Sequence, residues 1–355
     1  MNLYILDNNL NELKVIDTYE SFIWAERYNK SGDFELHTVV SDEILKYCKL
    51  DYFIVGSFSD RAMIIEEIKV VADIENGNHI IIKGRSLESI LDRRIVWGQT
   101  TLKGNFQIAI QRLLNESIIN PTDPNRKIDN FRFESSTDER ITNLNIQAQF
   151  TGKSLLKVIE SLCQERQLGF KITLKNKEFV FKLYAGIDRS YNQNKEPYVV
   201  FSPNFENIIN SNYYESNTNM KNATLIGGEG EGKDRKYTQI TLPQATGLNR
   251  RELFTDARDI SSQSQSAISP TDYNNLLIQR GNEKLEKNRF VTGFEGEIEA
   301  TQMFKFNKDF FNGDIVEIAN EYGHSATSRI TEMIISDDNN GYAVYPTFES
   351  KEKNR

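Results

Sequence analysis

The residue types that most often carry catalysis or bind metals are scarce in this chain of 355 residues. It contains three histidines, His37, His79 and His324, and two cysteines, Cys48 and Cys163. A zinc site needs several Cys or His ligands at short spacing, and a disulfide-stabilised secreted domain needs more cysteines than two. Both are excluded. We predict that His37 and His79 are packed or surface residues on strands, and that both cysteines, which have apolar neighbours, are small core residues.

The glycine-rich segment Gly227–Lys233 (GGEGEGK) has the G-x-x-x-x-G-K spacing of a phosphate-binding loop. A functional loop of this kind continues with Ser or Thr as a metal ligand, whereas Asp234 stands here. Glu229 and Glu231 would also place negative charge where phosphate oxygens must lie. Because strand patterns occur on both sides, instead of a strand followed by a helix, the segment predicts a hairpin loop.

A second segment, Ser336–Gly341 (SDDNNG), resembles the start of a calcium-binding loop. It has Ser at the first ligand position and Thr347 where the bidentate Glu should fall, so it departs from the calcium motif at two key points. The segment also lies inside a strand–turn–strand pattern. It therefore predicts a hairpin turn.

Carboxylates alternate at Glu295, Glu297 and Glu299, which places them on one face of a predicted strand. Paired carboxylates can hydrolyse glycosides, but three on one face are more typical of a solvated or subunit-facing strand. The segment Gly323–Ser325 sets His324 beside Ser325, yet Thr327 replaces the second glycine of a G-x-S-x-G nucleophile motif. We therefore assign no catalytic, cofactor-binding or metal-binding residue, and we predict that the protein is not an enzyme.

The composition is that of a folded protein with two or three domains. Apolar residues make up 38% and charged residues 26%, and the net charge of −8 argues against a basic nucleic-acid-binding surface. Arg93-Arg94 and Arg250-Arg251 are too short for such a surface, although either pair can form an inter-subunit ion pair. The start, Met1–Leu13, lacks a basic region and predicts a first strand and turn. No stretch reaches the ~18 uncharged apolar residues of a membrane span, so we expect no stable membrane association.

Strand patterns and helical spacing alternate along the chain. Residues 1–84 and 294–348 show strand patterns, and hairpins are predicted at 62–71 with 79–83, at 170–174 with 178–184, and at 223–226 with 237–242. Helical spacing predicts helices over 86–94, 105–119, 154–167 and 270–289. The second should stop before Asn120-Pro121 and the third should be ended by Gly169. The last has Leu276, Arg280 and Leu285 near one face.

The first and last β regions resemble each other internally. Phe34–Leu36, Asp51–Val55, Met63–Ile68 and Asn76-Gly77 have the counterparts Phe294–Gly296, Asp314–Ile318, Ile330–Ile335 and Asn340-Gly341. The separations are similar: Glu67 to Gly77 is 10 positions and Glu332 to Gly341 is 9. Either strand and turn chemistry has converged on one pattern, or the chain holds two copies of a small β-barrel with an α/β unit between them.

Several segments also match a known kind of protein. They are Met1–Asp7, Tyr19–Trp24, Ser31–Leu36, Gly84–Gly98, Gly228–Gly232, Arg251–Asp259 and Gly313–Val316. On these segments, which are spread over nearly the whole length, the chain resembles siphophage and prophage tail proteins of the baseplate-hub type. The segment Gly84–Gly98 (GRSLESILDRRIVWG) is the most specific of them. None of the segments is a catalytic motif.

The resemblance implies an α+β, multidomain, phage tail-hub-like fold, with two related small β-barrel domains flanking an α/β domain. The expected boundaries are 1–102 for the first β-barrel domain, 103–196 for the α/β domain, 197–255 with 290–355 for the discontinuous second β-barrel domain, and 256–289 for a helical insertion packing on the α/β domain. Some family members carry a peptidase or lysozyme-like region beyond the hub. Since seven residues follow Phe348 here, we expect none.

The implied function is that of a structural hub protein at the tail tip or baseplate of a virion, assembled in the host cytoplasm. A homotrimer of such chains would present six similar β units, and this pseudo-sixfold ring would join a hexameric tail tube or distal tail protein to a threefold central spike or tail fibre protein. DNA would pass through the lumen without specific binding, because an acidic wall repels it. No cofactor is expected.

The main alternative is a tail component of the adhesin type that binds cell-wall carbohydrate. Such a protein would share the β-rich and aromatic-rich composition, with Tyr and Phe stacking on sugars. An exposed Trp near a groove would favour it. Trp24 and Trp97 both lie in apolar contexts, which predicts that they are core residues.

Overall fold

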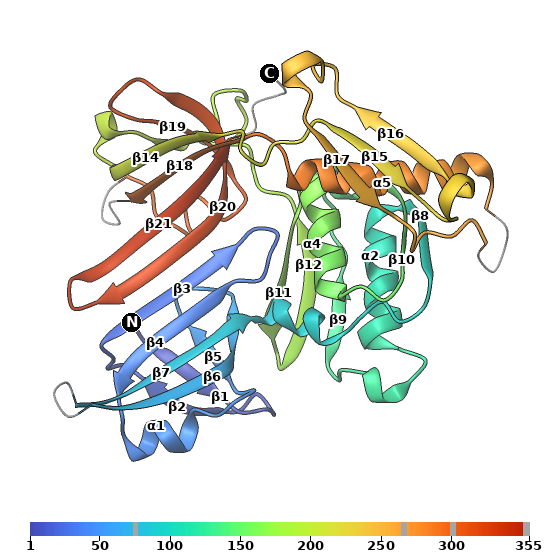
Figure 1. Ribbon diagram of the computed structural model, residues 1–355. Helices are drawn as coiled ribbons and strands as arrows, with labels where there is room; N and C mark the ends of the chain where they lie inside the picture. Colours follow the sequence, from blue (N-terminus) through green and yellow to red (C-terminus); the bar gives the residue numbers. More distant parts are fainter. Residues whose placement is uncertain (74–76, 264–267, 299–302, 351–355) are drawn as a thin grey trace.

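A computed structural model describes residues 1–73, 77–263, 268–298 and 303–350 of the chain (Figure 1). The fold is α+β, as predicted, and strands predominate. A 13-stranded sheet lies on one side of the molecule, and an α/β unit lies beside it. A further three-stranded sheet and the long helix α5 (Pro270–Lys287) cover the α/β unit.

The large sheet consists of two halves that come from the two ends of the chain. The first half contains β1 (Leu3–Leu6), β2 (Glu12–Ile16), β3 (Ser21–Arg27), β4 (Asp33–Val39), β5 (Phe53–Gly56), β6 (Ala62–Asp73) and β7 (Gly77–Ser86), with helix α1 (Asp42–Tyr47) between β4 and β5. The second half contains β13 (Val200–Phe201), β14 (Ile208–Ser216), β18 (Val291–Ile298), β19 (Ile315–Ala319), β20 (Ser325–Asp338) and β21 (Gly341–Ser350). Predicted strands at the start of the chain and in both regions are thus confirmed.

The two halves pair their strands in the same order. The first runs β3-β4-β7-β6-β5 and the second runs β14-β18-β21-β20-β19, with every neighbouring pair antiparallel. A bulge stands at the same place in both: Glu66 is the extra residue in β6 and Thr331 is the extra residue in β20. The internal repeat predicted from the sequence is therefore present in the strand order.

Aromatic residues confirm which positions of the two halves are equivalent. Trp24 lies opposite Phe34 in the first half, and Tyr213 lies opposite Phe294 in the second. The loop after β5 places Phe58 on Trp24, with ring centroids 5.3 Å apart, and the loop after β19 places His324 on Tyr213 at 4.6 Å. Trp24 and Tyr213 are thus counterparts.

The repeat differs from the predicted alignment at two places. Ile65 and Ile330 each precede the shared bulge, so the predicted match of Met63 with Ile330 is wrong by two residues. Before β5 and β19 the difference is one residue. The backbone N–H of Asp51 donates to Ile65 at 2.8 Å, and that of Gly313 donates to Ile330 at 2.8 Å. Asp51 is therefore equivalent to Gly313, and its predicted match with Asp314 is wrong. Both positions have a positive φ, 66° and 100°. Asp and Gly each tolerate this conformation, so the two halves share the same backbone turn before β5 and β19 although the residue types differ.

The α/β unit follows the first half of the large sheet. Its elements are the 3₁₀ helix η1 (Leu87–Arg93), β8 (Thr100–Asn105), α2 (Phe106–Leu114) with a π-helical turn η2 (Asn115–Ile119), η3 (Pro124–Arg126), β9 (Phe131–Glu134), α3 (Glu139–Thr142), β10 (Asn145–Phe150), α4 (Leu155–Arg166), β11 (Gly169–Lys175) and β12 (Glu178–Tyr184). Asn105 caps α2 by accepting a hydrogen bond from Ile108 N. The helix ends before Pro121, as predicted.

Helix α4 ends differently from the prediction. Gln167 takes the left-handed position at its C-terminus, with φ of 59°, and Gly169 instead begins β11. A Cβ at Gly169 would collide with the ring of Tyr28. This glycine is therefore required by close packing, and the helix ends before it. The hairpin turn at Asn176-Lys177 is confirmed, with both residues at positive φ.

The strands β15 (Ala223–Gly227), β16 (Tyr237–Thr241) and β17 (Glu252–Asp256) form a sheet of their own. The segment 197–255 was expected to belong to one barrel, but within the described residues these three strands pair only with one another. The reason lies in α5, because Gly281 brings this helix against Ile226 and Ile240. Those apolar side chains are buried against the helix instead of another sheet. Helix α5 also contacts α4 and β10 of the α/β unit.

The two halves of the large sheet are joined edge to edge. Residues Glu332–Asp338 of β20 pair antiparallel with β3, so the hairpin of β20 and β21 reaches down to β3 in Figure 1. Among the described residues the strand path ends at β2 and β14 and does not return on itself.

Tyr28 lies where the three parts of the fold meet. Its side chain is 1% exposed. Its backbone N–H donates to Thr331 of the second half at 3.0 Å. Its hydroxyl donates to the carbonyl of Gln167, between α4 and β11, at 3.0 Å and accepts from the N–H of Gly186, just after β12, at 3.1 Å. The ring of Tyr184 packs edge-on at 5.2 Å.

The ring of Tyr28 is also enclosed from the second half. The guanidinium of Arg329 lies 5.2 Å from the ring centroid, and a Cβ at Gly313 would collide with the ring. Burial raises the pKa of the Tyr28 hydroxyl. The phenol thus stays neutral and fixes the orientation of all three parts.

We predict that Gly313→Ala lowers the free energy of unfolding by about 2 to 4 kcal/mol, because the substitution adds strain at positive φ to a clash with Tyr28. Gly323→Ala is the matched control. Gly323 also has positive φ, 83°, but a Cβ there meets nothing within 4 Å. It should lose only about 1 kcal/mol. Chemical denaturation of both variants measures the difference, and equal losses would contradict a packing role for Gly313.

Candidate functional site

The segments with motif-like spacing are used in turns. The glycine-rich segment forms the connection between β15 and β16, with a short 3₁₀ turn at Gly232–Asp234, so the predicted hairpin is confirmed. The acidic segment forms the turn between β20 and β21, also as predicted. There Asp337 accepts hydrogen bonds from the N-terminal amine at 3.0 Å and from Tyr19 at 2.5 Å. Its carboxylate is thus used to hold the start of the chain.

His37 and His79 lie on the paired strands β4 and β7, with His37 opposite Ile81 and Val39 opposite His79, and His324 lies in the loop after β19. Each histidine has a local contact of its own. His37 contacts Glu35 on the same strand at 2.5 Å, and His79 contacts Glu20 at 2.9 Å. His324 stacks on Tyr213. Among the described residues, which are 1–73, 77–263, 268–298 and 303–350, no group of three or more His, Cys, Asp or Glu side chains could hold a metal ion.

Of the three alternating carboxylates, Glu295 and Glu297 lie on β18, and Glu299 lies outside the described residues. Glu295 is exposed. Cys48 and Cys163 are buried, as predicted, and burial raises the pKa of the Cys48 thiol to about 12. Neither thiol is therefore poised as a nucleophile. No helix in the described part of the chain is long and apolar enough to cross a membrane.

The two tryptophans differ. Trp24 is fully buried, as predicted, but Trp97 is 72% exposed, so its prediction as a core residue is wrong. Val96 forms backbone hydrogen bonds with Lys153 and Gly152 in an extended segment and is itself buried. Neighbouring side chains of an extended chain point in opposite directions, so Trp97 faces outward. The guanidinium of Arg126 lies 5.1 Å from its ring centroid.

Buried charges that the sequence analysis did not single out join the first half of the large sheet to the α/β unit. Arg61 forms an ion pair with Glu88, and both are almost completely buried. Glu88 also accepts from the backbone N–H of Ile172 in β11 at 2.9 Å. Glu26 lies 4.0 Å from Arg61, and burial raises the pKa of Glu26 against the opposing effect of that cation.

A second junction fixes the segment after β12 to the other half of the sheet. Asp314 accepts from the guanidinium of Arg189 at 2.8 Å and from the backbone N–H of Ile187 at 2.7 Å. Asp314 is 2% exposed. The segment Gly313–Val316, which carries part of the family resemblance, thus serves two contacts: Gly313 faces Tyr28 and Asp314 holds Arg189.

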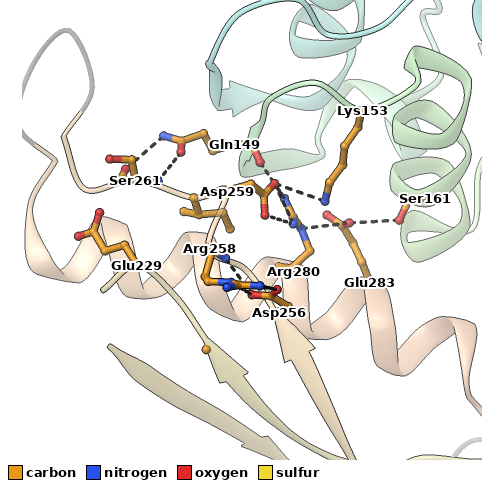
Figure 2. A network of polar contacts seen from close by, with 12 residues as sticks. Gln149, Lys153, Ser161, Glu229, Asp256, Arg258, Asp259, Ser261, Arg280 and Glu283 are labelled. Carbon is orange, nitrogen blue, oxygen red and sulfur yellow. Dashed lines mark hydrogen bonds and ion pairs between the residues drawn. The ribbon is translucent and has the colours of Figure 1, made fainter. Parts of the chain in front are cut away.

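A third junction, shown in Figure 2, lies between α5 and the α/β unit. Arg280 of α5 donates to Asp259 at 2.9 Å and to the carbonyl of Gln149 at 3.0 Å. Ser161 of α4 donates to Glu283 at 3.2 Å. Burial would raise the pKa of Asp259, but Arg280 and Lys153 together outweigh it, so the pKa is lowered. The position of Arg280 among leucines on one predicted helix face was the signal in the sequence.

The loop after β15 is fixed by the same region. Glu229 accepts from the backbone N–H of Ser262 at 2.9 Å and from Lys236 at 2.6 Å. Burial would raise the pKa of Glu229, but these hydrogen bonds, with one from the Ser262 hydroxyl, lower it to about 2. The glutamate thus ties the glycine-rich loop to the chain that follows β17.

Comparisons with known proteins identify the class of this fold. The tail protein of Neisseria meningitidis MC58 is 12% identical with a TM-score of 0.59, and the alignment covers 99% of this chain and 96% of that one. The 43 kDa tail protein of prophage MuSo2 from Shewanella oneidensis is 11% identical with a TM-score of 0.59, covering 98% of each. Prophage tail protein gp18 of Listeria monocytogenes EGD-e is 12% identical with a TM-score of 0.54, covering 100% and 96%.

The fold is therefore that of prophage tail proteins. The model of the Siphovirus ReqiPepy6 Gp37-like protein family matches residues 2–348, and the chain belongs to this family. The resemblance to siphophage and prophage tail proteins is thus confirmed. No curated protein matches the chain.

We predict that Glu229→Gln removes stability above pH 5 and has little effect near pH 2. The lowered pKa of Glu229 in the folded state means that its ionised form stabilises the fold above its ordinary value of 4.5, and that this contribution is lost as the pH falls toward 2. With a quarter of the side chain exposed, we expect about 1 to 2 kcal/mol at pH 7. Glu231→Gln, an exposed carboxylate in the same loop, is the control. Unfolding curves between pH 2 and 7 measure both variants, and a pH-independent loss in Glu229→Gln would contradict this account.

Proposed function

We propose that the protein is a structural hub of a phage or phage-derived tail and forms a trimeric ring at the tail tip or baseplate. The observation that carries the proposal is the repeated strand order, with its shared bulge, within one chain. Each half of the large sheet would form one of the two related barrel-like units. Three chains then contribute six similar units.

A ring built in this way reconciles two symmetries. Closed cyclic assemblies need heterologous contacts, in which two different surfaces of each subunit meet. Two similar halves per chain supply such surfaces at near-equal angles around the axis. One side of the ring can then bind a hexameric tail tube or distal tail protein, and the other a threefold central spike or tail fibre protein.

The proposed role is non-enzymatic. The motif-like segments form turns and each histidine has a local contact of its own. The buried charges join the parts of the fold: Arg61 with Glu88, Asp314 with Arg189, and Arg280 with Asp259. Removing such groups would affect assembly and stability, not a chemical step.

We also propose that DNA passes through the lumen without being bound. This part of the proposal rests on the net charge of −8 of the chain, since on the strands β4 and β20 Glu35 pairs with Lys83 and Glu332 pairs with Arg27. An overall acidic ring would repel the phosphate backbone and let DNA slide. A neutral lumen with an acidic outer surface would remove the basis for this part of the proposal.

The exposed Trp97 favours the alternative function, binding of cell-wall carbohydrate, at one site. An exposed indole next to Arg126 offers a flat surface on which a sugar ring can stack. Titration of cell-wall polysaccharide into the protein and into Trp97→Ala separates the two functions. Binding that is lost in the variant would establish the adhesin-like role. If the wild-type protein does not bind the polysaccharide, the hub function remains the proposed one.

We predict that the purified chain assembles into trimers. Native mass spectrometry should show a species of three times 41.0 kDa, and electron micrographs should show rings with six similar lobes. A monomer at high concentration, with no ring in micrographs, would contradict the proposed function.

A further inference from the structure

The contact between the two halves of one chain is a pairing of strand edges. Residues Glu332–Asp338 of β20 lie antiparallel to β3, with Ile335 opposite Trp24 and Ser336 opposite Ile23. Ile335 is 1% exposed and belongs to the core of the first half, although it comes from the second. The edge of one half is thus covered by the other.

The repeat identifies the equivalents of these two edges. The shared bulge aligns Glu332 with Glu67, so the second part of β20 corresponds to the second part of β6. Ile335 then corresponds to Val70, and Ser336 to Val71. The aromatic pairs Trp24 with Phe34 and Tyr213 with Phe294 align Trp24 with Tyr213. Strand β3 therefore corresponds to β14, and Ile23 corresponds to Asn212.

Both equivalent edges are open within the described residues. From Glu67 onward β6 pairs with β7 alone, because β5 reaches only Ala62–Ile64. Strand β14 pairs with β18 alone. Val70 is 53% exposed, whereas its counterpart Ile335 is 1% exposed. An open strand edge that bears exposed apolar side chains is normally covered by another strand.

We propose that β6 of one subunit pairs antiparallel with β14 of a second copy of the chain, with Val70 opposite Tyr213 and Val71 opposite Asn212. This rests on the proposed trimer. A second copy is the fitting partner because each chain carries both edges, and the chain already pairs their counterparts once. The loop that places His324 on Tyr213 is compatible with this pairing, since the equivalent loop places Phe58 against Trp24, edge-on instead of stacked, while β3 pairs with β20.

Every joint around the ring then has one geometry. Within a chain β20 pairs with β3, and between chains β6 pairs with β14, so six near-equal joints alternate around the axis. The path from β14 to β6 continues from each subunit into the next and closes. Closure removes both open edges.

Disulfide trapping tests the register. In the double variant Val71→Cys and Asn212→Cys, opposite Cβ atoms lie about 4.5 to 5.5 Å apart, close enough for a bond after small adjustment. Mild oxidation should convert most of the protein to covalent trimer on non-reducing gels. Val71→Cys with Ser216→Cys is the control on the same strands. Those residues are offset by four positions, about 13 Å, and should not cross-link. Cys48 and Cys163 are buried and add no background.

A second test uses the exposed apolar residue itself. Val70→Asp would place an unpaired charge in the new joint and should raise the dissociation constant of the trimer about tenfold or more. Val39→Asp is the matched control, because Val39 is 58% exposed in the free chain but lies on β4, away from both edges. It should assemble as the wild type does. Circular dichroism of both variants checks that the monomer is folded.

The outcomes separate the two proposals. If the wild type forms a trimer but Val71→Cys with Asn212→Cys gives no more cross-linking than the offset pair, the strand pairing is overturned and the hub function stands. Unchanged assembly of Val70→Asp would overturn it as well. If the wild type does not assemble, both proposals fall.

Discussion

The orientation of the whole molecule depends on the enclosure of one tyrosine. Tyr28 follows β3, donates a hydrogen bond to Gln167 at the end of α4, accepts one from Gly186 just after β12, and packs against Gly313 and Arg329 of the second half. A buried phenol whose hydroxyl has both partners can occupy only one position without leaving a polar group unsatisfied. Its ring therefore sets the angle between the halves, and with it the direction in which their outer edges face.

The charged junctions add selectivity to this arrangement more than stability. Desolvation offsets much of the attraction in a buried ion pair, but a misplaced partner leaves an uncompensated charge in the interior. Arg61 with Glu88, and Arg280 with Asp259, therefore penalise relative placements of the parts other than the observed one. The proposed ring, which would repeat one shape around an axis, would need this property more than additional stability.

Local features of the fold could be predicted from the sequence, and non-local partners could not. The turn at Asn176-Lys177 and the end of α2 before Pro121 depend on the conformational preferences of a few adjacent residues. The internal repeat was visible because its turns and bulge keep their spacing. The sheet of β15–β17 was assigned to the wrong neighbour, since Ile226 and Ile240 would suit any apolar surface and nothing local specifies α5. Trp97 was wrongly predicted to be a core residue, because the alternation of side chains in an extended segment does not tell which set of alternate residues faces the core.

The two halves keep one backbone plan while exchanging side-chain volume. At the position where Gly84 of β7 lies beside Phe34, Phe348 of β21 lies beside Phe294. A Cβ at Gly84 would collide with the carbonyl of Ile64, so the first half fills the space with Trp24 and Phe34, and the second fills it with the ring of Phe348. Cores tolerate such exchange when the total volume is conserved. Residue identity can therefore diverge while strand order, bulge and edges persist. Because a ring would require equal edges rather than equal cores, this divergence is compatible with the proposed assembly of six near-equivalent units from three chains.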